Sequence, residues 1–245
     1  MAEPLLHVDN LGKRFGGFVA LDGINLSVQA GERVGLIGPN GSGKSTLVNC
    51  MCGTLRNETG TVRFDGRIVD GLAANQRTHR GMARSFQLPR PFHTLSVAEN
   101  LRIPLLFTAH SRSGRHLTRE ETESRCHELA GLVGLAAKAS KLPRDLTQVE
   151  MRKLELARAM AADPKLLIAD EAMAGLSQSE VTDIVDLLIK LNERGVTIIL
   201  IEHIMRAVMS FSQRLVVLVS GKKIADGVPD QVVNTREVIG AYLGE

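Results

Sequence analysis

The stretch of sequence that decides the fold of this chain reads Gly38-Pro39-Asn40-Gly41-Ser42-Gly43-Lys44-Ser45-Thr46. It matches the phosphate-loop pattern G-x-x-x-x-G-K-[ST] at every fixed position. Its glycines let the backbone turn tightly, so that successive N–H groups can point at phosphate oxygens. Lys44 adds a compact positive charge for the β- and γ-phosphates, and the Ser45 hydroxyl can bind Mg²⁺. A glycine-rich turn that binds nothing is the alternative interpretation.

The residues on either side of this loop favour phosphate binding. The apolar run at residues 33–37 predicts a buried strand, and residues 45–49 can begin a helix. The motif requires this order of strand, loop and helix, because the helix N-terminus then faces the bound anion. The sequence therefore predicts a nucleoside triphosphate site whose cradle is the whole stretch from Gly38 to Thr46.

The composition is that of an ordinary globular protein and limits the possible function less closely than the phosphate loop does. Of 245 residues, 44% are hydrophobic and 23% are charged, and the formal net charge is +3. So small a net charge gives no argument for nucleic acid or an anionic membrane as a partner. No run is long enough to span a bilayer, and the N-terminus lacks the pattern of a signal peptide. Three cysteines form no disulfide framework, so we expect reduced, half-buried thiols in a cytoplasmic protein.

Local patterns predict two kinds of sheet. Three β-prone runs in the first third, joined to a hairpin turn at Asp65-Gly66, predict an antiparallel layer beside the phosphate loop. In the second half strands alternate with helices, which predicts a parallel sheet covered by helices. The expected strands are residues 5–9, 24–28, 61–64, 67–69, 166–169, 196–202, 215–219 and 222–225, and the expected helical runs are 118–139, 150–162, 178–193 and 204–211.

An acidic pair follows the expected strand at residues 166–169. In open α/β sheets, ligands bind at the carboxyl ends of the strands, so Asp170 and Glu171 are expected beside the phosphate loop. Asp170 can hold Mg²⁺ through a water, because this cation prefers oxygen ligands and keeps part of its hydration. Glu171 is then placed to orient or deprotonate the water that attacks the γ-phosphate. Two surface acids at a strand end are the plainer alternative.

Five further segments stand in a fixed order around these two motifs. They are Lys13-Arg14-Phe15-Gly16-Gly17, Arg84-Ser85-Phe86-Gln87, Leu146-Thr147-Gln148-Val149-Glu150, Ala174-Gly175-Leu176-Ser177 and Ile201-Glu202-His203. With this order, the chain resembles over its whole length the ATP-binding subunit of an ABC transporter. Taken singly, each segment has an ordinary structural explanation, such as a core phenylalanine or a solvated glutamine.

The resemblance implies roles for particular residues. Phe15 would stack on adenine, and Gln87 would reach the metal and the attacking water and sense a membrane partner. His203 would be the switch histidine that bonds the γ-phosphate. Thr147 and Val149 would contact the γ-phosphate of ATP held by a second subunit.

The resemblance also implies an architecture. A single domain, residues 1–245, would be an α/β phosphate-loop NTPase with a parallel sheet, an N-terminal antiparallel β layer and a helical subdomain. Residues 1–87 and 156–245 would form the catalytic core, and 88–155 the helical subdomain.

The finer resemblance is to ATPases of branched-chain amino acid importers, whose relatives serve urea, amides and small organic acids. The segments that carry it are Phe15-Gly16-Gly17, Asp170-Glu171-Ala172-Met173-Ala174-Gly175-Leu176, Glu202-His203-Ile204-Met205-Arg206-Ala207-Val208 and Ala241-Tyr242-Leu243-Gly244-Glu245. It implies ATP and Mg²⁺ as cofactors and a place on the cytoplasmic face of the membrane. The implied partners are permease subunits, a second ATP-binding subunit and, indirectly, a solute-binding protein, with no nucleic acid. The ending would leave no room for a regulatory domain.

Two departures from the family pattern concern the trans-subunit contacts. The signature is usually written LSGGQ, and here both glycines are replaced. Thr147 keeps the hydroxyl, but Val149 cannot take a positive φ cheaply, so the loop must differ if the glycine form needs such an angle. Ser177 replaces an aspartate of many relatives and can serve as a helix N-cap.

Three other functions stay open from the sequence. A soluble ATPase acting on ribosomes or DNA usually carries two ATP-binding halves or a coiled coil, which are not evident here. A nucleotide-binding module without hydrolysis is opposed by Glu171 and His203. An exporter ATPase of the lipopolysaccharide type shares the same motifs.

Overall fold

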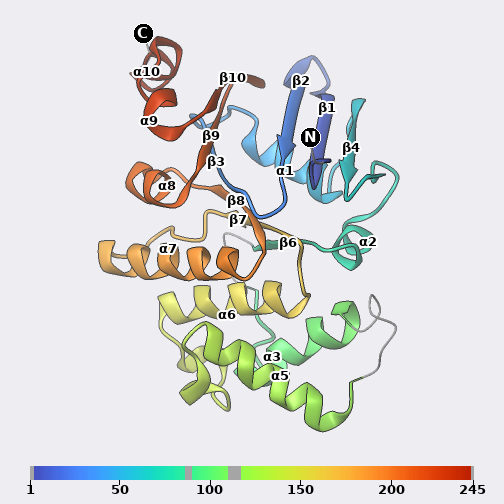
Figure 1. The fold of residues 1–245 in the computed structure, drawn as a ribbon, viewed down its shortest axis with the longest axis vertical. Helices are drawn as coiled ribbons and strands as arrows, with labels where there is room; N and C mark the ends of the chain where they lie inside the picture. The colour runs from blue at the N-terminus through green and yellow to red at the C-terminus, as the bar shows by residue number, and fades with distance from the viewer. Residues whose placement is uncertain (1–2, 86–89, 110–116, 244–245) are drawn as a thin grey trace.

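The computed structural model describes residues 3–85, 90–109 and 117–243, which form two β-sheets and surrounding helices (Figure 1). The strands are β1 (Leu6–Phe15), β2 (Phe18–Val28), β3 (Arg33–Ile37), β4 (Thr59–Phe64), β5 (Arg67–Ile68), β6 (Met82–Ser85), β7 (Leu166–Asp170), β8 (Thr197–Ile201), β9 (Arg214–Val219) and β10 (Lys222–Gly227). The α-helices are α1 (Lys44–Cys52), α2 (Ala74–His79), α3 (Val97–Pro104), α5 (Arg119–Leu132), α6 (Gln148–Ala161), α7 (Gln178–Glu193), α8 (Met205–Phe211), α9 (Pro229–Val232) and α10 (Arg236–Leu243). Short turns of π- and 3₁₀-helix are η1 (Leu105–Ala109), η2 (Ala136–Lys138) and η3 (Pro143–Asp145).

The smaller sheet is the predicted antiparallel layer. Its strand order is β2-β1-β4-β5, and every pairing in it is antiparallel. The predicted hairpin after β4 is present, with Asp65 and Gly66 at φ angles of 51° and 71°. Strands β1 and β2 are longer than expected, because they pair with each other as far as Phe15 and Phe18. This sheet covers α1, whose Leu47, Val48 and Met51 are fully buried beneath it.

The larger sheet carries the predicted parallel core. Its order is β10-β9-β3-β8-β7-β6, with β10 antiparallel and the other strands parallel. Side chains of β7 alternate between the two faces: Leu166 and Ile168 pack against the α1 side, and Leu167 and Ala169 pack against the helices opposite. Both faces are therefore buried, which explains why these strands have continuous apolar sequences.

Five of the described strands and α-helices have no counterpart among the predicted ones, namely α2, β6, α3, α9 and α10. Strand β6 is short and ends in Arg84 and Ser85, so it has neither an apolar run nor a clear alternation. It forms because it pairs in parallel with β7 at the edge of the sheet. Helices α2 and α3 are six and eight residues long, too short for periodicity to reveal.

Helices α3, α5 and α6 pack together at the end of the molecule away from the antiparallel sheet (Figure 1). Leu129 and Val133 are buried there, and Leu132 packs partly buried against the same cluster. Helix α7 joins this cluster to the parallel sheet through Ile184 and Leu188.

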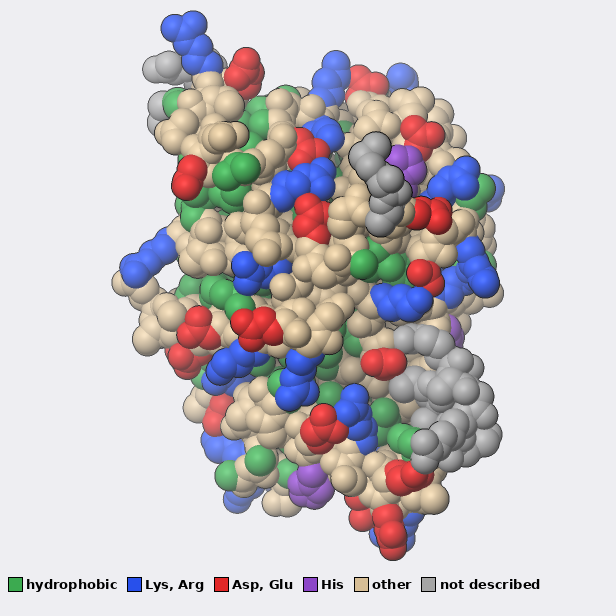
Figure 2. Space-filling view, in the orientation of Figure 1, with side chains coloured by type: hydrophobic (Ala, Val, Ile, Leu, Met, Phe, Trp, Pro, Cys, Tyr) green, Lys and Arg blue, Asp and Glu red, His purple; other side chains and the backbone are tan. Residues whose placement is uncertain are grey.

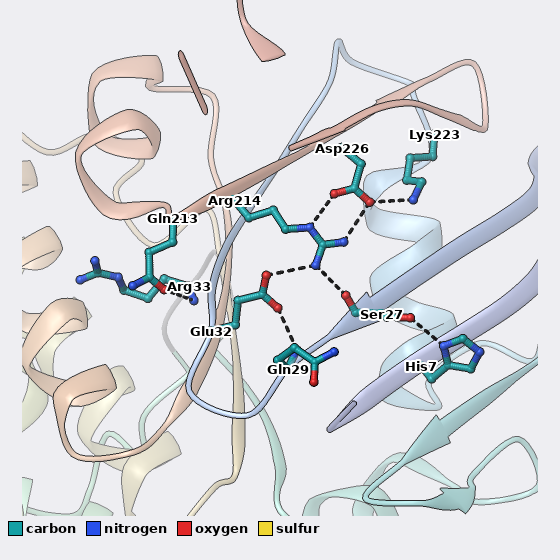
Figure 3. Close-up of polar contacts among 9 residues, drawn as sticks. All are labelled: His7, Ser27, Gln29, Glu32, Arg33, Gln213, Arg214, Lys223 and Asp226. Carbon is teal, nitrogen blue, oxygen red and sulfur yellow. Dashed lines mark hydrogen bonds and ion pairs between the residues drawn. The ribbon is translucent and has the colours of Figure 1, made fainter. Parts of the chain in front are cut away.

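Arg214 ties the two sheets together (Figure 3). From β9 its guanidinium donates to both carboxylate oxygens of Asp226 on β10, at 2.6 and 2.9 Å. Its Nη1 also donates to the backbone carbonyl of Ser27 on β2 at 2.9 Å and to Glu32 Oε1 at 3.0 Å. A planar guanidinium can serve all these acceptors at once, so one side chain fixes the antiparallel sheet against the edge of the parallel sheet.

The surface agrees with the modest net charge of the chain. Acidic and basic side chains are interspersed over the face seen in Figure 2.

All three cysteines are free. They are buried, whereas the sequence predicted half-buried thiols; Cys50 and Cys52 lie on α1 between the sheets. Burial raises the pKa of both these thiols to about 11. Within the described ranges, the structure contains no helix with the length and apolar character needed to cross a membrane.

Candidate nucleotide site

The predicted phosphate loop joins the central strand β3 to α1, and its glycines are required by close backbone approaches. Gly43 has a φ of 101°, and a Cβ there would lie 2.7 Å from the carbonyl oxygen of Ala20. A Cβ on Gly38 would lie 2.1 Å from the carbonyl oxygen of Leu218. No other residue fits either position without moving a neighbouring strand.

The loop is braced by a turn far away in the sequence. The N–H of Gly221, in the turn between β9 and β10, donates to the carbonyl of Ser42 at 3.0 Å. The carbonyl of Gly221 in turn accepts from the N–H of Asp22 on β2 at 2.8 Å. The sequence predicted the two strands that flank this turn, but no local pattern indicates that the turn supports the phosphate loop.

Lys44 lies at the start of α1 within reach of the loop. Its Nζ donates to the carbonyls of Gly38 at 2.7 Å and Pro39 at 3.0 Å. Burial lowers the pKa of Lys44, while the negative charges of Glu171 and Asp170 oppose this change. Helix α1 has no side-chain N-cap and no acidic residue in its first turn, so its free N–H groups and its dipole face the loop.

Three strand ends bring the predicted catalytic residues together. In the parallel sheet Leu36 of β3 and Asp170 of β7 both pair with Ile201 of β8. The phosphate loop, Glu171 and His203 follow these strands and therefore emerge at the carboxyl ends of the parallel strands. Open α/β sheets bind ligands at these ends.

Asp170 and Glu171 have different surroundings. Asp170 is buried, and its Oδ2 accepts a hydrogen bond from Arg84 at 2.6 Å. Glu171 is partly exposed and has a φ of 47°, with its N–H donating to the carbonyl of Ile201 at 2.9 Å. A positive φ is costly for glutamate and persists only when the surrounding structure imposes it, as often happens at functional sites.

His203 projects from the end of β8 beside a residue that the sequence did not single out. Its side chain is 67% exposed, and its Nδ1 lies 3.9 Å from the carboxylate of Glu202. Glu202 is buried, and its Oε1 accepts from the N–H of Met173 at 2.8 Å. Burial raises the pKa of Glu202 above its ordinary value. Glu202 therefore connects the chain after β8 to the chain after β7.

Thr147 and Val149 lie at the N-terminus of α6, and no hydrogen bond among the described residues joins them to the phosphate loop. Thr147 caps this helix: its Oγ1 accepts from the N–H of Glu150, and its own N–H donates to Glu150 Oε2 at 2.8 Å. Val149 has no positive φ and is a partly buried residue of the helix. The helix instead contacts the segment after β7, since Gln148 and Arg152 donate to the carbonyl of Ala174 at 3.5 and 3.3 Å.

The remaining residues singled out from the sequence are Phe15, Ser177 and Gln87. Phe15 is at the β1–β2 turn with its side chain half exposed, and Lys13 Nζ lies 5.4 Å from the centre of its ring. Ser177 is the N-cap of α7, as predicted, and bonds the carboxylate of Glu180. Gln87 lies outside the described residues.

The donor set fits Mg²⁺ bound together with a nucleotide. The Ser45 hydroxyl and the Asp170 carboxylate supply hard oxygen atoms, and in the described ranges no donor bonds the Oδ1 of Asp170. In those same ranges no cluster of three or more His, Cys, Asp or Glu side chains could hold a metal by itself. The protein therefore offers part of a coordination shell, and phosphate oxygens would complete it.

A phosphate loop before an open helix N-terminus, with an acidic strand end in register beside it, defines a phosphate-loop nucleotide-binding protein. The family model described as "ABC transporter" matches residues 21–174. The chain therefore belongs to the ABC transporter family and is one of its ATP-hydrolysing, ATP-binding cassettes.

Relatives and solved structures match over nearly the whole chain. The high-affinity branched-chain amino acid transport ATP-binding protein BraF of Pseudomonas aeruginosa is 38% identical and covers 100% of both chains. LivG of Escherichia coli, with the same description, is 36% identical and also covers 100% of both. The crystal structure of an ABC transporter cassette in its ADP conformation has a TM-score of 0.89 at 30% identity, covering 100% of both chains. A dimeric cassette bound to ADP and Pi in a post-hydrolysis state has a TM-score of 0.80 at 27% identity, covering 91% of this chain and 98% of that one.

Proposed function

We propose that this chain hydrolyses ATP to drive an importer of branched-chain amino acids or a related amino acid or amide. The proposal of ATP hydrolysis rests on the register of the parallel strands, whose carboxyl ends bring the phosphate loop, Asp170, Glu171 and His203 together. The substrate class is supported by full-length similarity to BraF and LivG, which are described as branched-chain amino acid transport proteins.

In this proposal the loop from Gly38 to Thr46 cradles the phosphates, and Lys44 exchanges its loop carbonyls for phosphate oxygens. Phe15, half exposed at its turn, stacks on the adenine. Ser45, Gln87 and Asp170 would hold Mg²⁺, which supplies positive charge to the β- and γ-phosphates. Burial around Lys44 strengthens its electrostatic interaction with the phosphates.

Hydrolysis is assigned to the residues at the strand ends. Glu171 orients the attacking water and accepts its proton, and the imposed backbone angle at this residue holds the carboxylate in place. His203 and Gln87 bond the γ-phosphate and the water and fix the direction of attack. Glu202 keeps the segments after β7 and β8 in register through its bond to Met173.

The proposal includes a second cassette, identical or paralogous, whose Thr147–Val149 region would cover the γ-phosphate. The dimeric relative bound to ADP and Pi supports this arrangement. Residues 88–155 would form a helical subdomain that contacts permease subunits at the cytoplasmic face of the membrane. Residues 1–87 and 156–245 would form the catalytic core. A solute-binding protein would supply the substrate to the permease.

The test is Glu171→Gln, which keeps the shape of the side chain but cannot accept a proton. We expect ATP turnover to fall by about 10²- to 10⁴-fold, measured as phosphate release, while equilibrium binding of ATP is retained. Glu193→Gln is the matched control, since Glu193 is an exposed residue at the end of α7. Near-normal turnover by Glu171→Gln would remove Glu171 from the role of base.

The transported solute needs a separate measurement. In proteoliposomes holding the chain and its membrane partners, ATP should drive accumulation of leucine, isoleucine or valine. Turnover that responds to none of these, nor to related amides, would reject the proposed substrate class while leaving the ATPase assignment intact.

A further inference from the structure

Arg84 bridges two elements of the nucleotide site. It is the third residue of β6, and its guanidinium reaches across to β7 and to α1. Its Nη2 donates to Asp170 Oδ2 at 2.6 Å, and its Nη1 donates to Asn49 Oδ1 at 2.7 Å. Both members of the ion pair are largely shielded, with 16% of the Arg84 side chain and 12% of the Asp170 side chain exposed.

The position of Asn49 on α1 shows which part of the nucleotide site Arg84 contacts. Asn49 follows Ser45 by four residues in α1, so the two side chains lie on the same face of the helix, one turn apart. Arg84 therefore spans from the face of α1 that carries the proposed metal ligand Ser45 to the other proposed ligand, Asp170. The two ligands come from α1 and β7, which are far apart in the sequence, and Arg84 on β6 bonds to Asn49 of α1 and to Asp170 of β7.

The chemistry of the guanidinium suits this task. A planar fork can bond two acceptors in fixed directions, whereas an ammonium group is a point charge on a flexible stem. A buried carboxylate also needs a partner for its charge, and Arg84 supplies one. Arg84 bonds the Oδ2 of Asp170, and no donor among the described residues bonds the Oδ1, so the Oδ1 stays available to a metal-bound water.

We propose that Arg84 is a positioning residue for the metal subsite: it fixes Asp170 relative to α1 so that Asp170 and Ser45 can serve one Mg²⁺ together. Arg84 acts through Asp170 and Asn49 and does not itself contact the nucleotide. This inference rests on the proposed roles of Ser45 and Asp170.

The experiment measures binding of a fluorescent ATP analogue to the full chain, by titration in EDTA and at increasing Mg²⁺. For Arg84→Met we expect the Mg²⁺ concentration that gives half of the metal-dependent gain in affinity to rise by about 10-fold or more, as for other groups that orient metal ligands. Affinity in EDTA should change less than about twofold. Arg84→Lys should give an intermediate Mg²⁺ requirement, because an ammonium group on its flexible stem does not reproduce the fork that bonds Asp170 and Asn49 together.

Two further variants keep the inference testable if Arg84→Met folds poorly. Asn49→Ala leaves the ion pair intact and should raise the required Mg²⁺ by a smaller factor. Combining it with Arg84→Lys should give less than the sum of the two effects, because both act on one bridge. Arg119→Met, which breaks an exposed ion pair on α5, is the control and should change nothing.

An equal loss of affinity with and without Mg²⁺ would overturn the inference, since it would mean that Arg84 acts on the nucleotide or on the fold. An unchanged Mg²⁺ requirement in Arg84→Met would also overturn it. If Glu171→Gln stalls turnover while Arg84→Met leaves the Mg²⁺ requirement unchanged, the proposed function stands and only the role of Arg84 falls.

Discussion

Helices α1 and α6 both begin at segments predicted to contact ATP phosphates, yet their N-termini are built differently. Helix α1 begins after Gly43, whose backbone is in the left-handed conformation. The helix has no side-chain cap and no acidic residue in its first turn. Helix α6 begins with a complete capping box between Thr147 and Glu150, and Lys138 forms a 2.7 Å ion pair with the same carboxylate. The first helix offers free N–H groups to an anion, and the second has its own carboxylate at that place.

The difference teaches that the two predicted phosphate contacts are not equivalent in this chain. Helix α1 is ready to bind phosphate, because its positive end has no competing group. At α6 a phosphate from a second subunit would meet Glu150, where the family pattern has a neutral glutamine. Lys138 partly offsets that charge and holds the pKa of Glu150 below its ordinary value. The three changes below separate the two helix ends.

The largest effect is expected from removing the lysine of α1. Lys44→Ala should weaken ATP binding by about 10- to 100-fold, since a charge-assisted hydrogen bond contributes about 1.5–3 kcal/mol. Lys138→Ala, the corresponding change beside α6, should leave binding of ATP by the single chain unchanged. Isothermal titration calorimetry compares them, and unchanged affinity in Lys44→Ala would contradict the assignment of the phosphate loop.

A smaller effect is expected at the cap of α6. Thr147→Ala should lower the free energy of unfolding by about 1 kcal/mol, because the helix loses its N-cap oxygen. Thr147→Ser keeps that oxygen and should behave as wild type in urea denaturation. If Thr147→Ala is as stable as the wild type, the capping box adds nothing and α6 is more like α1 than the structure indicates.

The smallest change concerns the charge at α6. Glu150→Gln keeps an acceptor for the Thr147 N–H but removes the negative charge, so ATP-dependent dimerisation should strengthen by about two- to fivefold. Val149→Gly should not strengthen it, because Val149 already has a helical backbone and no positive φ. Size-exclusion chromatography or light scattering with the Glu171→Gln background would measure both. If Val149→Gly instead strengthens dimerisation more than Glu150→Gln does, the missing glycine is what weakens dimerisation in this signature.

The charge of Glu150 also predicts a pH dependence for this comparison. Because Lys138 lowers the pKa of Glu150, the charged carboxylate stabilises the folded chain above the ordinary glutamate pKa of about 4.3. This stabilisation is lost as the pH falls through the lowered pKa of the folded state. The difference in stability between wild type and Glu150→Gln should therefore vanish at low pH, as urea denaturation at several pH values would show.

Much of the fold followed from local patterns. Strands β3, β7, β8 and β9 of the parallel core and helices α7 and α8 lie within a few residues of their predicted positions, because apolar runs and caps act within one segment. Strand β6 and helix α2 were not predictable in this way, since pairing with β7 and packing on neighbours define them. The burial of Cys50 and Cys52 was misjudged for the same reason, since it depends on the sheet that covers α1.

The candidate site divides in the same manner. The sequence alone determined the phosphate loop, the acidic pair after β7 and the order of the motifs, because each is a contiguous pattern with its own chemistry. Only the tertiary structure decided which distant residues complete the site. Gly221 braces the loop, Glu202 joins two strand ends, and Arg84 connects Asp170 to α1. Hydrogen bonds between segments remote in the chain depend on how the sheet brings those segments together, and no local pattern specifies that arrangement.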